Sequence, residues 1–347
     1  MKPGPIPVSS RALARRRHVT PGPSGIITLL TDFGLEDPYV GVMKGVLLGI
    51  NPGARLVDLT HAIPPQDILR GALALQGAYA WFPRGTIHLA VVDPGVGGAR
   101  RPLAVGVGGH YFVGPDNGLL GFLFEAPGAG AVTLTNAAYH RRGVSRTFHA
   151  RDVFAPVAAY CSLGVPLARF GPAVRDPVRL PWPQARRAGR RVVGQVLLAD
   201  RFGNLLTNVA AADVPVDRQR CEVEIGGCRM DGVVGAYSER PAGTLGALID
   251  SSGRLEIFVR DGSARERLGL GPGAPVSLWS RSSSTSRRTT RGLSRTTSRG
   301  LRRPSPKAPR ASRSRRSRPA PSSSPTPSLS SVTRTGSPSR TSLSPSG

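Results

Sequence analysis

Three expected strands end on carboxylate-bearing residues, and the third is followed by an arginine. Asp32 follows the run IITLLT, Asp58 lies near the end of RLVDLT, and Asp93 follows TIHLAVV. A Pro-Gly and Gly-Gly turn then leads to Arg100, and such a turn requires Gly and Pro but neither charged residue. In open α/β sheets, ligands bind outside the carboxyl ends of the strands. These side chains at one sheet edge therefore indicate a crevice for a polar ligand, while each carboxylate taken alone could equally cap a helix or form a turn.

Strands alternating with helices would deliver these residues to one edge of a sheet. Short continuous apolar runs are typical of strands buried on both faces, and the spacing of Val40, Met43, Val46 and Leu47 places them on one helix face. Strands are expected at 26–31, 55–60, 86–92, 103–107, 111–114 and 131–135, and helices at 38–50, 67–82 and 152–164. The pattern predicts an α/β N-terminal domain over 25–170 with a central, mostly parallel sheet.

The rest of the chain divides into a linker, a β domain and two basic tails. Residues 171–191 are rich in Pro and Arg and are expected to link the domains. Residues 192–279 contain short strand-like runs between Gly turns, which predict a small all-β, barrel-like C-terminal domain. Residues 1–24 and 280–347 hold 5 and 16 Lys and Arg residues and no Asp or Glu, so we expect a disordered leader and a disordered Ser/Arg/Pro-rich tail.

Several classes of protein find no support in the sequence. There is no GxGxxG after the first strand and no GxxxxGK[ST], so neither the usual dinucleotide fold nor a P-loop is indicated. The six His residues show no metal-ligand spacing, so we expect no metal site. Three cysteines without a CxxC suit a reducing cytoplasm, and no apolar run reaches the ~18 residues of a membrane span. The body over 25–279 is only mildly basic, with 26 Lys and Arg against 21 Asp and Glu, and we expect a cytoplasmic protein without membrane contact.

Two further clusters could carry chemistry. RTFHARD places His149 just before an expected helix, although a solvated loop histidine or an N-cap at Asp152 would explain the same residues. LLADRFGNLLTN places Asp200, Phe202 and Asn204 on a tight turn between strands. An aromatic ring beside amide and carboxylate groups could bind a ligand such as adenine, and an ordinary Asp/Gly/Asn turn would have the same sequence. Both interpretations of each cluster stay open at this level.

Seven motifs in a fixed order carry a family resemblance. They are TLLTDFG…DPYVGVMKG, INPGARLVDLTHAIPPQD, GTIHLAVVDPGVGGARR, FVGPDNGLL, RTFHARDVFAP, DRFGNLLTN and SSGRLEIFV. Together they resemble the S-adenosyl-L-methionine (SAM) hydroxide adenosyltransferases, the adenosine-forming SAM hydrolases that are related to SAM-dependent fluorinating and chlorinating enzymes. The resemblance covers about 25–279, which is the body without either tail.

The resemblance implies an α/β N-terminal domain, a β-barrel-like C-terminal domain and a homotrimer. SAM would lie between the N-terminal domain of one subunit and the C-terminal domain of the next, as the substrate and with no cofactor. Water would displace methionine at C5′ and yield adenosine and L-methionine. Asp93, Arg100 and His149 match the residues around that water. A guanidinium favours the anionic form of water, while carboxylate and imidazole groups accept a proton and orient the attack.

The same residue-by-residue match implies the contacts with the substrate. Asp32 would hold the ribose hydroxyls and Asp37 the methionine ammonium, while Tyr237 would pack on adenine. Asp200, Phe202 and Asn204 match the cross-subunit pocket for methionine and the adenine edge, and Ser251 and Ser252 match contacts with the methionine carboxylate. After LEIFV the family usually has Asn where this chain has Arg260, which puts the adenine-edge contacts at that position in question.

Two other functions compete with SAM hydrolysis. A SAM-dependent halogenase of the same fold would need a dehydrated halide pocket, which the carboxylate of Asp93 would oppose by repulsion. A nucleic-acid-associated protein would act through the basic tail, which lacks interleaved aromatic residues after Trp279 and would bind unspecifically. A frame-shifted extension without function is the alternative explanation of the tail. A scaffold, however, has no need to combine Asp93, Arg100 and His149.

Overall fold

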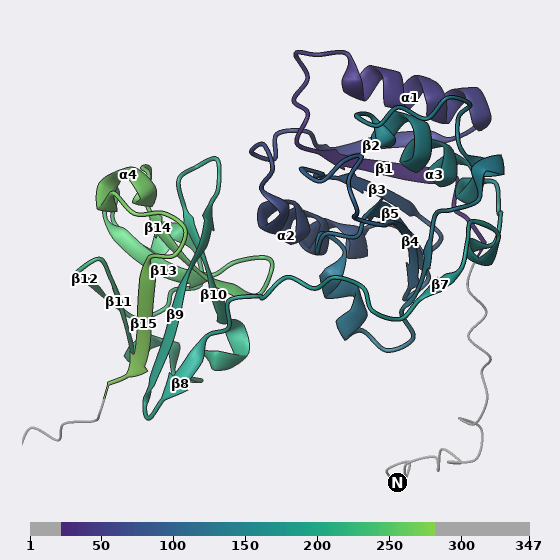
Figure 1. Cartoon of the computed structure of the whole chain (residues 1–347). Coiled ribbons are helices and arrows are strands. Elements are labelled where there is room, and N and C mark those ends of the chain that lie inside the picture. The colour runs from purple at the N-terminus through teal and green to yellow at the C-terminus, as the bar shows by residue number, and fades with distance from the viewer. Residues whose placement is uncertain (1–21, 282–347) are drawn as a thin grey trace, which may run out of the picture. The chain divides into compact units, whose positions relative to one another are not determined.

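A computed structural model describes residues 22–281, which form an N-terminal α/β domain and a C-terminal β domain (Figure 1). The expected disordered leader, the expected disordered tail and the nucleic-acid binding assigned to that tail fall almost entirely on 1–21 and 282–347 and so lie outside the described residues. In the described part of the chain, no helix is both long and apolar enough to cross a membrane.

The N-terminal sheet has the strand order β2-β1-β3-β5-β4-β6-β7. Neighbours from β2 to β5 are parallel, whereas those from β5 to β7 are antiparallel. The expected mostly parallel sheet is therefore mixed, because β4 and β5 are joined through Gly108 and Gly109, a connection too short for a parallel crossover. The strands are β1 Ile26–Thr31, β2 Arg55–Thr60, β3 Ile87–Val91, β4 Pro102–Val107, β5 His110–Pro115, β6 Gly130–Thr133 and β7 Ala173–Val174.

Helices cover both faces of this sheet (Figure 1). α1 (Tyr39–Ile50) and α3 (Ala155–Ser162) pack on one face and α2 (Ile68–Ala78) on the other. The four residues expected on one face of the first helix are the buried ones of α1. Asp67 caps α2 by accepting the N–H of Arg70 at 2.9 Å. A π-helix, Ala150–Phe154, precedes α3 and begins beside His149.

The strand register brings the expected strand ends to a common edge. Thr31 of β1 lies opposite Val91 of β3 in a parallel pair. Asp32 and Asp93 therefore follow strands that end at the same edge, as the sequence predicted.

The C-terminal domain is a nearly closed antiparallel sheet. Its strand order is β12-β11-β15-β9-β10-β14-β13, with β8 paired to β9. A single bridge between Val234, which follows β12, and Leu248 of β13 connects the two ends of this order and nearly closes the sheet. Alternate residues of β11 (Cys221, Val223 and Ile225) are buried in its core. The elements are β8 Arg186–Ala188, β9 Arg191–Ala199, β10 Leu205–Ala210, β11 Cys221–Ile225, β12 Cys228–Asp231, β13 Leu245–Ile249, β14 Arg254–Val259, α4 Ala264–Leu268 and β15 Pro275–Ser280. Of the segment 171–191, β7 joins the first sheet and β8 the second.

A buried polar cluster lies in the N-terminal core. Thr28 Oγ1 is 2.8 Å from Nδ1 of His88, and Nε2 of His88 is 3.2 Å from Nδ1 of His110. The His88 ring also stacks on Phe112, with the ring centroids 4.9 Å apart. Burial, and then the charge of His110, lower the pKa of His88 to about 3. His88 is therefore neutral in the folded chain at neutral pH.

The neutrality of His88 predicts a loss of stability in acid. Below its ordinary pKa of 6.5, the unfolded chain binds a proton at His88 that the folded chain excludes until about pH 3. The free energy of unfolding should therefore decrease as the pH is lowered through this range. The contribution of His88 to this decrease approaches about 1.4 kcal/mol per pH unit. Denaturant unfolding of the full chain and of His88→Gln across this range checks the effect. The variant should show a shallower pH dependence, and equal slopes would contradict the prediction.

Candidate active site

The turn after β3 brings Asp93 and Arg100 together. Arg100 donates from Nε to the two carboxylate oxygens of Asp93 at 2.9 and 3.0 Å, and its Nη2 donates a further hydrogen bond to Oδ2. The side chains of Arg100 and Asp93 are 8% and 5% exposed, so the pair is largely removed from water. A bidentate guanidinium–carboxylate pair is firmly oriented. The sheet edge thus presents a cation and an anion side by side.

His149 contacts the same guanidinium from 49 residues further along the chain. Nη2 of Arg100 donates to Nδ1 of His149 at 2.9 Å. Since a guanidinium has no acceptor, Nδ1 is the unprotonated nitrogen and Nε2 carries the proton of the neutral ring. Burial, followed by Arg100, lowers the pKa of His149, although Asp93 and Asp152 act in the opposite direction. The interpretation of His149 as a solvated loop residue therefore fails, and its imidazole is neutral near neutral pH.

Two residues that support Asp93 and Arg100 were not identified from the sequence. The Phe154 ring lies under Arg100, whose Cζ is 5.3 Å from the ring centroid. The amide of Asn117 donates to the backbone carbonyl of Val92 at 2.8 Å and so fixes the end of the strand before Asp93. An apolar residue in a helix and an Asn in a turn carry no distinctive signal, because both are common in such elements. Only their place in the fold connects them to Arg100 and Asp93.

A glycine allows the two halves of the group to meet. Gly97 has a φ of +73°, and a Cβ at this position would lie 2.1 Å from the backbone oxygen of Arg146. Any larger residue would strain the backbone and push away the segment that leads to His149. The Gly-rich turn between Asp93 and Arg100 is thus explained by close backbone packing as well as by turn geometry.

Asp32 and Asp37 lie on the segment after β1. One carboxylate oxygen of Asp32 accepts the N–H of Gln66 at 2.8 Å, and Gln66 has a φ of +68°, which is strained for a residue with a side chain. Asp37 is exposed. Among the described residues, no hydrogen bond or ion pair joins Asp32 or Asp37 to Asp93. Backbone strain is typical of ligand-binding segments, so Asp32 stays a candidate for binding.

Asp58, the remaining strand-end carboxylate, has structural partners. Nζ of Lys44 lies 2.6 Å from Oδ2 of Asp58, and Nε2 of His61 lies 3.0 Å from Oδ1. Burial would raise the pKa of Asp58, but the hydrogen bonds of Lys44 and His61 outweigh it and the pKa is lowered. Nδ1 of His61 is 2.8 Å from the hydroxyl of Thr31. Asp58 therefore ties α1 and β2 together, which agrees with the structural interpretation of this carboxylate.

In the C-terminal domain, the turn between β9 and β10 is built on Asp200. Its Oδ1 accepts the N–H groups of Phe202 and Asn204 at 2.9 and 2.8 Å, and its Oδ2 accepts the Asn204 amide at 3.3 Å. Phe202 is left 78% exposed. A large aromatic ring held outward on a rigid turn loses little entropy when a ligand stacks on it. The hydrogen bonds of Asp200 are those of an ordinary Asx turn, and the same turn exposes the aromatic ring of Phe202.

Tyr237 and Glu256 form a second polar pair in this domain. The Tyr237 hydroxyl donates to Oε1 of Glu256 at 2.7 Å, and its ring packs edge-on against Phe258. Glu256 is only 4% exposed. Burial raises its pKa to about 7, with Asp200 and Asp250 adding to the increase and Tyr237 acting against it. Sequence reasoning missed Glu256, because a Glu in a strand ordinarily faces solvent, whereas five consecutive residues of β14 are buried.

Ser251, Ser252 and Arg260 are the remaining candidate residues of the C-terminal domain. Ser252 donates from its hydroxyl to both oxygens of Asp250, at 2.7 and 2.9 Å, while Ser251 is exposed. Arg260 donates to the backbone oxygens of Ser238 and Arg240 at 3.2 and 2.7 Å. These oxygens belong to the turn that starts at Tyr237, so Arg260 braces that turn from within the domain. In residues 22–281 there is no cluster of three or more His, Cys, Asp or Glu that could hold a metal ion, and the expected lack of a metal stays a prediction.

Comparisons with known proteins converge on one family. Residues 27–171 match the model of the SAM hydroxide adenosyltransferase N-terminal domain, and residues 194–277 match that of its C-terminal domain. The (R)-S-adenosyl-L-methionine hydrolase of Thermus thermophilus is 44% identical over 260 residues, which cover 73% of this chain and 98% of that protein. A fluorinase of an Actinoplanes species is 28% identical over 217 residues, 54% of this chain and 73% of that protein. The crystal structure of an uncharacterized conserved protein from Thermotoga maritima is similar with a TM-score of 0.69 and 34% identity, covering 73% of this chain and 99% of that one.

Proposed function

Because the chain belongs to the SAM hydroxide adenosyltransferase family, we propose that it hydrolyses SAM to adenosine and L-methionine with Asp93, Arg100 and His149 around the attacking water. The hydrolase activity follows from the family and from the 44% identity to a SAM hydrolase. The observation that carries the site assignment is the contact of one guanidinium with both Asp93 and His149. SAM is the substrate, and the proposed reaction uses no cofactor.

The reaction is a displacement at C5′ of SAM. The water oxygen bonds to C5′, the C5′–S bond breaks, and its electron pair stays on sulfur, so methionine leaves as a neutral thioether. One proton is released from the attacking water. Arg100 stabilises the hydroxide character that develops on the oxygen, while Asp93 accepts a hydrogen bond from the water and takes up its proton. The lowered pKa of His149 keeps Nδ1 unprotonated, so that this nitrogen accepts from Arg100 and orients the guanidinium.

Water is favoured over halide at this site. Asp93 is a nearly desolvated carboxylate beside Arg100. A halide at the position of the attacking water would face this negative charge in a low-dielectric environment. A neutral water molecule meets no such repulsion and gains a hydrogen-bond acceptor. The rival function as a SAM-dependent halogenase is therefore disfavoured by the same contact that favours hydrolysis.

The residues proposed to contact the substrate are exposed or partly exposed, apart from Asn204, which is 7% exposed. Phe202 and Tyr237 offer exposed aromatic surface for adenine, and Asp32 offers a carboxylate oxygen for the ribose hydroxyls. Asp37 is free to meet the methionine ammonium from solvent. The polar residues proposed to contact methionine and the adenine edge are Asp200, Asn204, Ser251 and Ser252.

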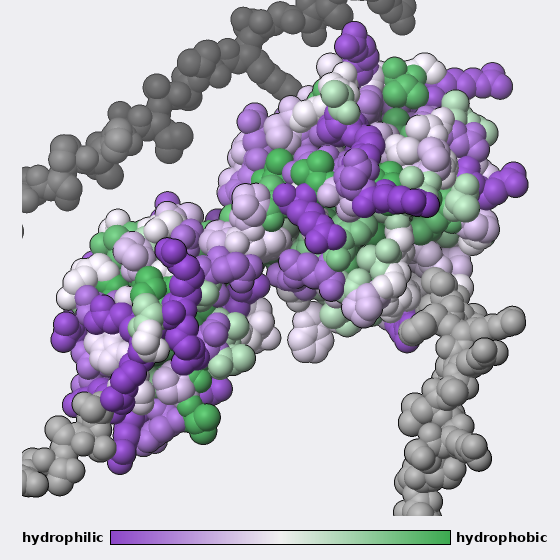
Figure 2. All heavy atoms as spheres, turned by 60° about the horizontal axis from the view of Figure 1, so that its bottom comes forward, coloured by the Kyte–Doolittle hydropathy of each residue, from purple (hydrophilic) through white to green (hydrophobic). Residues whose placement is uncertain are grey.

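The proposed assembly is a homotrimer with its active site between subunits. Apolar side chains lie among polar ones on the visible face of the molecule (Figure 2). Val42 and Leu48 of α1 and Val57 of the edge strand β2 are each exposed by more than a third. Exposed apolar residues beside a strand that lies at the sheet edge in residues 22–281 support contact with another subunit.

The cytoplasm is the proposed location. The three cysteines of the described chain are unpaired, as a reducing compartment would keep them. Unspecific binding of nucleic acid by residues 280–347 stays a prediction from their charge.

Incubation of the purified full chain with SAM in ¹⁸O-water tests the proposed function. Mass spectrometry should find adenosine with ¹⁸O at the 5′-oxygen and unlabelled L-methionine. Chloride or fluoride added to the same reaction should yield no 5′-halonucleoside. A folded chain that forms no adenosine, or adenosine without the label, would disprove attack by water at C5′.

A further inference from the structure

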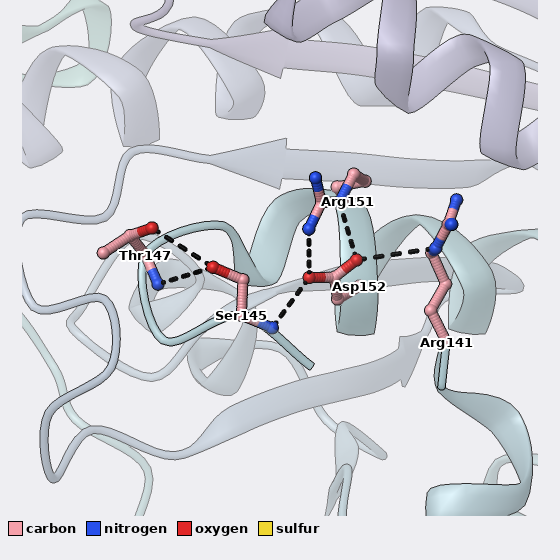
Figure 3. Close-up of polar contacts among 5 residues, drawn as sticks. All are labelled: Arg141, Ser145, Thr147, Arg151 and Asp152. Carbon is pink, nitrogen blue, oxygen red and sulfur yellow. Dashed lines mark hydrogen bonds and ion pairs between the residues drawn. The ribbon is translucent and has the colours of Figure 1, made fainter. Parts of the chain in front are cut away.

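A buried carboxylate outside the proposed catalytic group anchors the segment that carries His149 (Figure 3). Oδ2 of Asp152 accepts the backbone N–H of Ser145 at 2.9 Å. Arg151 donates to the two oxygens of Asp152 at 2.7 and 2.8 Å, and Nε of Arg141 lies 3.6 Å from Oδ1. The Asp152 side chain is 1% exposed, so its charge is retained only because these partners offset the loss of solvation.

The backbone of Asp152 holds the same segment. Its carbonyl accepts the N–H of Arg141 at 2.9 Å, and its own N–H donates to the carbonyl of Phe148 at 3.1 Å. Asp152 is thus bonded to the start, the middle and the end of residues 141–148. The alternative interpretation, in which Asp152 caps a helix, does not hold, because the residue lies inside the π-helix and its side chain binds the loop before it. The side chain and the backbone of Asp152 thus both hold residues 141–148 in place.

The π-helix explains why this anchoring matters for the site. His149 immediately precedes the π-helix and Phe154 ends it, and both contact Arg100. A π-helix is rare and frequently marks a functional site. Among the described residues, Asp152 itself has no hydrogen bond or ion pair with Asp93 or Arg100. Asp152 can therefore act on the reaction through the placement of His149 or through the effect of its charge on the His149 ring.

We propose that Asp152 is a positioning residue, which holds residues 141–148 against the π-helix and thereby keeps His149 in hydrogen-bonding distance of Arg100. The proposal rests on the proposed function for its effect on rate, whereas the placement of His149 can be measured without it. No catalytic role is assigned to Asp152, since it does not reach the reacting atoms.

The test uses the full-length Asp152→Asn variant, which removes the charge with little change of size. We expect the rate of adenosine formation at saturating SAM to fall about 100-fold, since a displacement of about 1 Å has such an effect, while KM changes by less than about threefold. NMR titration of the His149 ring gives a second readout. Release from Arg100 and from burial should raise the pKa of His149 toward its ordinary 6.5.

The direction of that pKa change separates positioning from simple charge removal. Burial and Arg100 lower the pKa of His149, Asp93 and Asp152 raise it, and His140 is a further ionisable neighbour. If the loop stayed in place, loss of the Asp152 charge alone would lower the pKa of His149 further. A lowered pKa, or a variant with an unchanged rate at saturating SAM, would overturn the proposal.

Asp116→Asn is the matched control. The Asp116 side chain is 2% exposed and, like Asp152, it pairs with an arginine, Arg101, and accepts one backbone N–H, that of Val178 at 2.8 Å. This variant should leave the pKa of His149 unchanged, and an equal shift would also overturn the proposal. If Asp152→Asn does not fold, Arg151→Gln weakens the same anchor and should shift the His149 pKa in the same direction. A wild-type chain without SAM hydrolysis would refute the proposed function, while the pKa of His149 would still test the placement.

Discussion

Asp93→Ala is expected to lower the rate of adenosine formation at saturating SAM by about 10²–10⁴-fold, the range for removal of a group that accepts a proton in the transition state. The variant loses the acceptor that orients water, and it leaves Arg100 without its bidentate partner. KM should change little, because Asp93 contacts Arg100 rather than any residue proposed to bind adenine or methionine. Steady-state measurement of adenosine by mass spectrometry, with kcat and KM fitted separately, checks the prediction.

Folding has to be separated from catalysis in this experiment. Arg100 is 8% exposed, and removal of one partner of a buried ion pair costs about 3–5 kcal/mol of stability. Asp93→Asn keeps the size of the side chain and an oxygen that can accept from Arg100, so it should fold better than the alanine variant. A comparable loss of rate in Asp93→Asn would assign the effect to the carboxylate charge. A fully active Asp93→Asn would refute the role of Asp93 in activating water.

Mixing two inactive variants is expected to restore activity if the active site lies between subunits. One variant is Asp93→Ala, and the other carries both Phe202→Ala and Tyr237→Ala. Phe202 and Tyr237 are 78% and 46% exposed, but the loss of Tyr237 also removes a hydrogen bond to the buried Glu256, so folding of this variant is checked first. In a cyclic trimer of randomly mixed subunits, about one quarter of the sites combine an intact N-terminal domain with an intact C-terminal domain. Co-expression with two different tags, followed by the SAM assay, should therefore give about a quarter of the wild-type rate.

Two outcomes of the mixing experiment would count against an intersubunit site. If each site were built from a single chain, every chain in the mixture would lack one half and no activity would return. If the mixed sample proved monomeric by light scattering, the trimer itself would be refuted. As a control, the two variants should be mixed after purification under conditions that prevent subunit exchange, and this sample should stay inactive.

Much of the architecture was predictable because it rests on local patterns. The helical spacing of Val40, Met43 and Leu47 predicted the buried face of α1, and the apolar runs predicted the strands on either side. The carboxylates after β1 and β3 were correctly placed at one edge, since neighbouring parallel strands end together. The mixed sheet was not predicted, because apolar runs reveal burial but carry no direction of pairing.

The sequence by itself determined that one domain is α/β and the other all-β, and which residues have side chains suited to catalysis or binding. Both follow from patterns of residue type between near neighbours in the chain. Only the tertiary structure decided that His149 donates no hydrogen bond from Nδ1 but accepts one from Arg100, 49 residues away. It likewise decided that Asp152 anchors a loop instead of capping a helix, and that Glu256 is buried with a raised pKa. Protonation and contact depend on desolvation and on neighbours brought together by folding, and the linear order of residues encodes neither directly.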